Sequence, residues 1–93
     1  MLCIMRKTKV TIINKLGLHA RASAKFVSTA ARFQSRIDVS KEAHSINGKS
    51  IMGIMLLAAN QGSELLLEIE GPDEDEMETA LLELINNRFH EAE

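Results

Sequence analysis

His19 and Arg21 stand at the expected start of a helix, where their side chains could do chemistry on an anion. Helices normally begin at Ser, Thr, Asp or Asn and carry acidic residues in the first turn. Here His19 holds the capping position, Arg21 adds charge to the positive end of the helix dipole, and residues 14–34 contain no acid. An imidazole, a guanidinium and free backbone amides at one point suit a bound or covalently attached phosphate.

The same surroundings favour a neutral imidazole, because the helix end and Arg21 both disfavour a second positive charge. A neutral ring nitrogen is a nucleophile that can attack a phosphoryl donor. The new negative charge would then lie against the helix amides and Arg21, which stabilises the product without a metal. The residues alone leave a second interpretation equally open, in which His19 is a surface loop histidine beside a solvated arginine.

The periodicity of apolar residues predicts the elements that must position this pair. Alternating patterns predict strands over residues 7–13, 36–40, 44–47 and 64–70. Helical spacing predicts helices over 20–33, 51–59 and about 73–89, the last with acids at its start. The order βαββαβα is not the strict alternation of a parallel fold. We therefore expect an α+β fold, in which a four-stranded antiparallel sheet is covered on one face by three helices.

Composition restricts the class of protein. The chain has 93 residues, 45% hydrophobic and 26% charged, which predicts one folded domain over residues 1–93. A net charge of -2 and 3% aromatic residues argue against a nucleic-acid surface. The single cysteine, Cys3, excludes an internal disulfide and fits a reducing cytoplasm. We expect no signal peptide and no membrane insertion, because no apolar run has the required length.

The chain resembles the HPr phosphocarriers of the phosphoenolpyruvate-dependent phosphotransferase system. Their active-site motif is similar to Asn14–Arg21, NKLGLHAR, and their second signature is similar to Gly48–Met52, GKSIM. The expected order of elements also agrees with the family's open-faced β-sandwich. The resemblance implies that His19 accepts a phosphoryl group on Nδ1 from enzyme I and transfers it to an EIIA-type protein or domain. Arg21, with the backbone amides of Ala20 and Arg21, would hold the phosphate, and no cofactor or metal is implied.

One position departs from the family pattern. HPr proteins commonly have proline after the active-site arginine, whereas this chain has Ala22. Alanine adds a backbone N–H and removes the fixed φ of proline from the first turn. The resemblance still predicts the carrier role, and Ala22 is where the rate of transfer and the lifetime of phosphohistidine could differ.

Ser50 stands at the expected N-cap of the second helix, where its hydroxyl would accept a hydrogen bond from a helix amide. The resemblance adds a regulatory phosphorylation of Ser50 by HPr kinase/phosphorylase. It also assigns Ile51, Met52 and Met55 to the surface that docks onto enzyme I and EIIA. This short helix carries more apolar residues than one buried stripe needs. The residues alone leave open that all three side chains belong to the core.

Other functions are weighed against the carrier. A regulatory HPr-like binding module, in a nitrogen-related branch or controlled by Ser50, would act through the docking surface while His19 is idle. The resemblance implies a monomer. A helix-on-sheet module that binds RNA ranks last, because the chain is acidic and poor in aromatic residues. A nucleotide-binding P-loop is excluded, since Ala43 occupies its first glycine position. His44 and His90 lack partners at metal-ligand spacing, so we expect solvated or packing roles for them.

Overall fold

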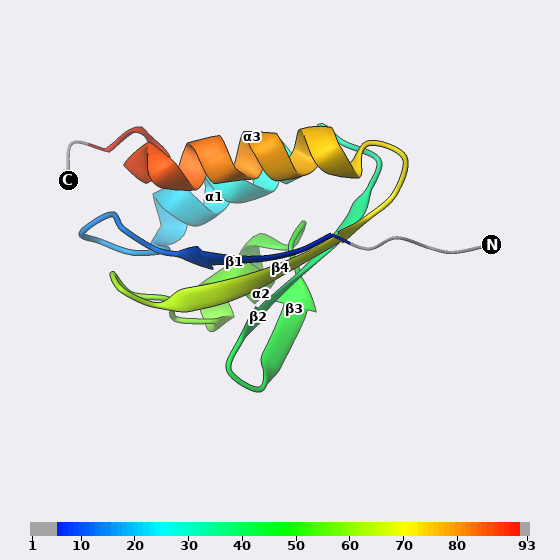
Figure 1. Cartoon of the computed structure of the whole chain (residues 1–93). Helices are drawn as coiled ribbons and strands as arrows, with labels where there is room; N and C mark the ends of the chain where they lie inside the picture. The colour runs from blue at the N-terminus through cyan, green and yellow to red at the C-terminus, as the bar shows by residue number, and fades with distance from the viewer. Residues whose placement is uncertain (1–5, 92–93) are drawn as a thin grey trace.

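The computed structural model describes residues 6–91, which form a four-stranded antiparallel sheet and three α-helices (Figure 1). The strands are β1 (Arg6–Thr11), β2 (Arg36–Lys41), β3 (His44–Asn47) and β4 (Glu64–Glu70). The helices are α1 (Ala20–Ala30), α2 (Ile51–Leu56) and α3 (Glu74–Asn86), and a short turn η1 (Arg88–His90) follows α3. This is the predicted α+β arrangement and element order. Cys3 lies outside the described residues.

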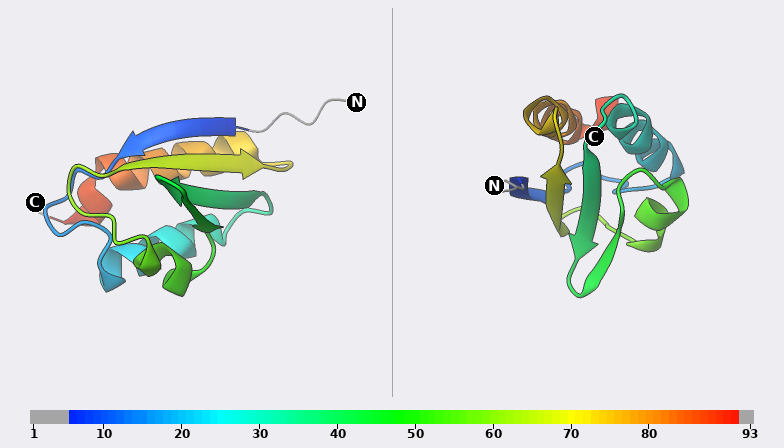
Figure 2. Two further views of the ribbon diagram at one scale, coloured as in Figure 1. Left: turned by 90° about the horizontal axis from the view of Figure 1, so that it is seen from below. Right: turned by 90° about the vertical axis from the view of Figure 1, so that its right-hand side faces the viewer.

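The sheet has the strand order β1-β4-β2-β3, so the last strand in sequence lies in the interior. Its register places Val39 opposite Leu67 and Ile37 opposite Ile69. Successive side chains of a strand point to opposite faces, and in β4 Leu65, Leu67 and Ile69 are buried while their neighbours are partly exposed. The three helices all lie on one side of the sheet (Figure 2). The buried face of each strand therefore packs against helices, as the alternating pattern predicts.

The core lies between this sheet face and the helices. Phe26 of α1 and Phe89 of η1 are its bulkiest fully buried side chains. Buried aliphatic residues of β1, β2 and β4 complete the core, and Ile46 of β3 packs against it partly buried. None of the helices within residues 6–91 combines the length and the apolar character that crossing a bilayer requires. The helices owe their placement to this packed layer, since isolated helices of such length are marginal in water.

The helices end earlier than the periodicity predicts. α1 ends at Ala30 rather than Phe33, and the amide of Phe33 turns back to the Ala30 carbonyl at 3.1 Å. α2 ends at Leu56 rather than near residue 59, because Ala58 has a left-handed φ of 51°. The Nζ of Lys41 donates to the Ala58 carbonyl at 3.0 Å and satisfies this helix end. Local backbone geometry, which apolar spacing does not report, sets these boundaries.

Asp73 joins the start of α3 to the loop before β2. Its carboxylate makes no hydrogen bond to an α3 amide and instead accepts from the backbone amides of Gln34 and Ser35, both at 2.9 Å. The Ser35 hydroxyl also donates to this carboxylate at 2.5 Å. The Ser35 hydroxyl, followed by the Gln34 amide, lowers the pKa of Asp73 below its ordinary value. A charge near the helix start thus fixes a tertiary contact.

Candidate functional site

The ring of His19 itself caps α1. Its Nδ1 accepts a hydrogen bond from the Arg21 amide at 3.2 Å, and its carbonyl accepts from the Ser23 amide at 2.8 Å. The expectation of free amides at this helix end is wrong for Arg21, because the ring folds back over the first turn. An amide N–H is a donor, so Nδ1 must be a ring nitrogen that carries a lone pair.

Gly17 and Leu18 fix the backbone that leads to His19. Gly17 has a φ of 67°, and a Cβ there would lie 2.5 Å from the carbonyl oxygen of Ala59. The Leu18 amide donates to this same oxygen at 2.8 Å, and the Ser23 hydroxyl donates to the Leu18 carbonyl at 3.1 Å. The loop is therefore held between the first turn of α1 and the segment after α2, which restricts the position of His19.

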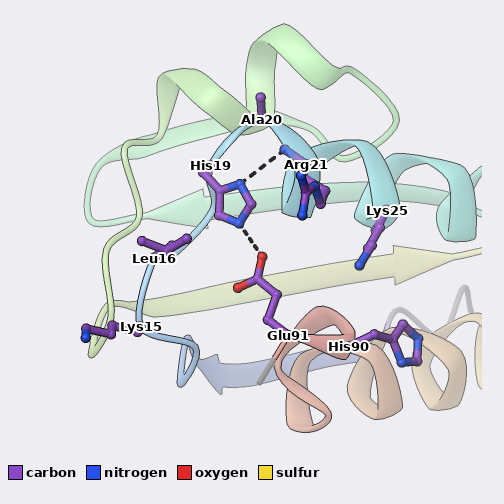
Figure 3. Close-up of a pocket in the computed structure, with 8 residues that line it drawn as sticks. All are labelled: Lys15, Leu16, His19, Ala20, Arg21, Lys25, His90 and Glu91. Carbon is purple, nitrogen blue, oxygen red and sulfur yellow. Dashed lines mark hydrogen bonds and ion pairs between the residues drawn. The ribbon is translucent and has the colours of Figure 1, made fainter. Parts of the chain in front are cut away.

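A carboxylate from the far end of the chain faces the second ring nitrogen of His19. Glu91 follows η1, and its Oε2 pairs with Nε2 of His19, as the close-up in Figure 3 shows. Its other oxygen, Oε1, accepts a hydrogen bond from Nδ2 of Asn14 at 3.0 Å. An ionised carboxylate only accepts, so Nε2 carries the hydrogen. Both ring contacts favour the tautomer with its lone pair on Nδ1.

The charge state of Glu91 follows from its contacts. Burial, the largest single cause, raises the pKa of the Glu91 carboxyl, whereas the hydrogen bonds from His19 and then from Asn14 lower it. Coulombic attraction to His19, when its ring is protonated, and to Lys25 lowers it further, and the net pKa lies below the ordinary value. Glu91 is therefore an anion at neutral pH, although only 15% of its side chain is exposed.

A cleft of about 870 Å³ opens beside His19 (Figure 3). The Lys25 side chain lies along it, and its Nζ donates to the Phe89 carbonyl at 2.6 Å. Most of the titratable groups around His19 are cationic or can become so, and Glu91 is the carboxylate among them. Such a lining suits a phosphate-sized anion next to the imidazole. The lining residues are Lys15, Leu16, His19, Ala20, Arg21, Lys25, His90 and Glu91.

Ser50 lies outside this cleft and caps α2. Its Oγ accepts a hydrogen bond from the Gly53 amide at 3.1 Å, the capping role that its position predicts. The neighbouring Lys49 donates from Nζ to the Phe33 carbonyl at 2.8 Å, which ties the start of α2 to the end of α1. A partly exposed hydroxyl at a helix start can be modified without unfolding the helix, because the dipole favours negative charge there.

The outer side of α2 is apolar and exposed. Ile51, Met52 and Met55 are exposed, which rules out the alternative that all three belong to the core. We use the term apolar surface for these residues together with Leu16 and Leu56, whose exposure ranges from 41% at Met55 to 76% at Leu56. Leu16 also lines the cleft at His19. Large exposed apolar groups next to a reactive side chain are typical of a protein-binding surface.

Sequence reasoning missed Asn14, Lys25 and Glu91 as parts of the site. Glu91 meets His19 across 72 positions of sequence, so no local spacing could have indicated the contact. His90, expected to be solvated or packed, is exposed on the rim of the cleft, while His44 is exposed on β3. No group of three or more metal-binding side chains gathers anywhere in residues 6–91.

Comparisons with known proteins agree on one family. Residues 6–87 match the family model described as the HPr component phosphorylation site of the phosphotransferase system. The phosphocarrier protein HPr of Pseudomonas aeruginosa is 54% identical over 90 residues, covering 96% of this chain and all of that protein. HPr of Cupriavidus necator is likewise 54% identical, over 89 residues, 96% of this chain and all of that protein.

Solved structures give the same result. HPr from Thermoanaerobacter tengcongensis superposes with a TM-score of 0.91 at 46% identity, covering 95% of this chain and 99% of that one. HPr from Bacillus anthracis superposes with a TM-score of 0.83 at 41% identity, covering 87% of this chain and 96% of that one. Sequence and fold therefore point in one direction over nearly the whole chain.

Proposed function

Because the chain belongs to the HPr family of phosphocarrier proteins, we propose that it accepts a phosphoryl group on Nδ1 of His19 from phospho-enzyme I and transfers it to an EIIA-type protein or domain. The observation that carries this proposal is the tautomer of His19. The Arg21 amide at Nδ1 and the Glu91 carboxylate at Nε2 both favour a lone pair on Nδ1. A ring nitrogen with a lone pair at a helix N-terminus is a nucleophile beside a site for its anionic product.

The chemistry needs no cofactor. The lone pair of Nδ1 attacks phosphorus, and the bond from phosphorus to the donor's ring nitrogen breaks. The Arg21 amide, 3.2 Å from Nδ1, then lies where it can donate to a phosphoryl oxygen. The Ala20 amide and the Arg21 guanidinium supply further donors at the same helix end, since a phosphate favours both. The chain would therefore be a carrier that is phosphorylated and dephosphorylated, rather than an enzyme that turns over a small molecule.

The apolar surface is the proposed docking site for both partners. Enzyme I and EIIA must in turn bring a reactive group to the same Nδ1, so both need a contact area next to His19. Leu16 on one side of His19 and the exposed residues of α2, Ile51, Met52 and Met55, provide it. Methionine side chains adapt to different partner shapes, which suits a surface with two partners. We place this exchange in the cytoplasm, with the carrier as a monomer.

Ser50 is the proposed regulatory position. Phosphorylation by an HPr kinase/phosphorylase would place a dianion at the first residue before α2, next to Ile51 of the apolar surface. A dianion there adds charge that an apolar partner surface would have to desolvate. Phosphorylated Ser50 would therefore weaken docking while leaving α2 folded. A chain that acts only through this surface, with His19 idle, is the second candidate function.

Intact mass spectrometry tests the proposal and separates the two candidates. The chain is incubated with phosphoenolpyruvate, Mg²⁺ and a general enzyme I, beside variants that each lack one of its three histidines. We expect one acid-labile phosphoryl adduct on the parent, on His44→Ala and on His90→Ala, and none on His19→Ala. An adduct that survives in His19→Ala, or no adduct on the parent with an enzyme I that phosphorylates another HPr, would contradict the proposal.

A further inference from the structure

The chain after α3 follows an unusual path to reach His19. Arg88, Phe89 and His90 have left-handed φ values of 55°, 55° and 63°, and none of them is glycine. Such residues cost free energy and persist only where the surroundings fix them. Phe89 is fully buried, and Lys25 donates to its carbonyl at 2.6 Å. This left-handed turn reverses the chain and places Glu91 over the start of α1.

Asn14 then fixes the carboxylate of Glu91. Its side chain is fully buried, and Nδ2 donates to both the Gly17 carbonyl at 2.8 Å and Oε1 of Glu91 at 3.0 Å. Its Oδ1 is buried without a hydrogen-bond partner among the described residues. Both neighbours of Nδ2 are acceptors, so a flipped amide would set oxygen against oxygen. The Gly17 carbonyl and Oε1 of Glu91 together therefore set the orientation of the Asn14 amide, while its own Oδ1 stays without a partner among the described residues.

We propose that Glu91 is a positioning residue for His19. Asn14 holds the Glu91 carboxylate, and the carboxylate keeps the ring hydrogen of His19 on Nε2 both before and after phosphoryl transfer. This inference rests on the proposed function and concerns the same site. Before transfer, a hydrogen fixed on Nε2 leaves the lone pair on Nδ1. After transfer, it keeps the phosphorylated ring positively charged, which makes Nδ1 a good leaving group for the next acceptor.

The step balances without a proton donor or acceptor. When His19 is phosphorylated, the Nδ1 lone pair forms the bond to phosphorus, and the electron pair of the broken bond stays on the donor's ring nitrogen. Nε2 keeps its hydrogen, and the positive charge gained by the ring lies against Glu91. When the phosphoryl group leaves His19, the acceptor's nitrogen attacks phosphorus and the electron pair of the breaking bond returns to Nδ1.

The charges around the ring make the prediction specific. The other titratable groups of the cleft are Lys15 from the loop, Arg21 and Lys25 from α1, and His90 from η1. Each of these groups is cationic or can become cationic, so each disfavours the positive charge of the phosphorylated ring. Glu91 opposes them. Replacing it with glutamine should loosen the Nε2 hydrogen and slow the loss of the phosphoryl group near neutral pH.

The first readout needs no phosphorylation. Nitrogen-15 NMR of the histidine rings, at a pH where the ring is neutral, reports which nitrogen carries the hydrogen. In the parent and in Glu83→Gln, a control with the same charge change on an exposed residue of α3, we expect the Nε2–H tautomer at His19. In Glu91→Gln we expect a larger share of the Nδ1–H tautomer. An unchanged His19 spectrum in Glu91→Gln would overturn the proposal.

The second readout is the decay of the adduct, followed by intact mass between pH 5 and 9. We expect the decay profile of Glu91→Gln to move to lower pH by about one unit, which corresponds to about tenfold slower decay near neutral pH. Asn14→Ala should move it in the same direction by less, with a thermal melt confirming that it is folded. A Glu91→Gln profile that overlays the Glu83→Gln profile would count against the proposal. A parent that forms no adduct would defeat the proposed function, while the ring spectrum would still decide whether Glu91 sets the hydrogen.

Discussion

The two long helices of this protein begin in opposite ways. α3 starts with three acids in its first turn, Glu74, Asp75 and Glu76, as the helix dipole favours. α1 has no acid in its first turn, is capped by an imidazole and carries Arg21 there. Both helices lie on the same side of the sheet, yet only α1 lacks a carboxylate in its first turn to compensate the positive helix end. The difference teaches that a helix start can give up local stabilisation where an external charge must bind.

α2 lies between these two cases. Its first turn also lacks acids, but Ser50 caps it with an ordinary hydroxyl. It has the local stabilisation of a capped helix and a group that can be phosphorylated. The three helix starts thus present the proposed phosphorylation site on the His19 ring, the proposed phosphorylation site on the Ser50 hydroxyl, and a start stabilised by permanent acids.

Ala20→Glu would make the start of α1 resemble that of α3. The new carboxylate should stabilise the fold by about 0.3–1 kcal/mol, because it complements the helix dipole. It should also lower the rate of phosphorylation of His19 by about 100-fold, since its negative charge repels the incoming phosphoryl group at the helix start. Urea denaturation measures the first effect and intact mass against time the second. Ser28→Glu, an exposed site near the other end of α1, should leave the rate unchanged. A faster or equal rate in Ala20→Glu would break the comparison.

Ser50→Asp tests the start of α2, the intermediate case, with a permanent negative charge. Aspartate is as good an N-cap as serine, so the free energy of unfolding should change little, whereas Ser50→Ala should lose about 1 kcal/mol. The added charge beside the apolar surface should weaken docking and lower the rate of phosphorylation by enzyme I by about tenfold. Ser50→Ala, which adds no charge, should keep the parent rate. Equal rates in both variants would remove the regulatory role from Ser50.

Ala22→Pro tests whether the backbone amide of Ala22 makes a helical hydrogen bond in α1. Ser23 is the first residue whose amide donates to a carbonyl four residues earlier, His19, so Ala22 precedes the helical hydrogen bonds. We expect a loss of less than about 1 kcal/mol in urea denaturation. Ser28→Pro, beyond the first turn of the same helix, should lose about 3 kcal/mol or more, because it removes a helical hydrogen bond. Similar losses in the two variants would show that Ala22 already belongs to the helix interior.

The Asp73 contact provides the smallest effect, at the start of α3. The pKa of Asp73 is lowered in the folded chain, so its stabilisation is full above the unfolded value of about 4 and is lost as the pH falls through the folded value. Asp73→Asn removes this group. Its free energy of unfolding should therefore fall less steeply than that of the parent when the pH is lowered from 5 to 2. Parallel slopes in urea titrations at several pH values would contradict this assignment.

Local sequence predicted most of the fold and two residues of the cleft, His19 and Arg21. Strand alternation and helical spacing depend on neighbours in sequence, which is why β4 was placed over the residues that form it, Glu64–Glu70. The ends of α1 and α2 were placed too late, because backbone turns such as that at Ala58 are set by tertiary packing. His19, Arg21 and Ser50 were singled out because each stands at a helix start, where residue type and position follow a physical rule.

What the sequence determined by itself was therefore the helix start at His19, its missing acids and the excess of apolar residues on α2. The contact of the Arg21 amide with Nδ1 of His19 is local, whereas only the tertiary structure places a carboxylate at Nε2. That carboxylate belongs to Glu91, which follows the buried Phe89 and the left-handed turn after α3. A hydrogen bond depends on the distance between two atoms in space, and residues separated by 72 positions meet only when the whole core has formed.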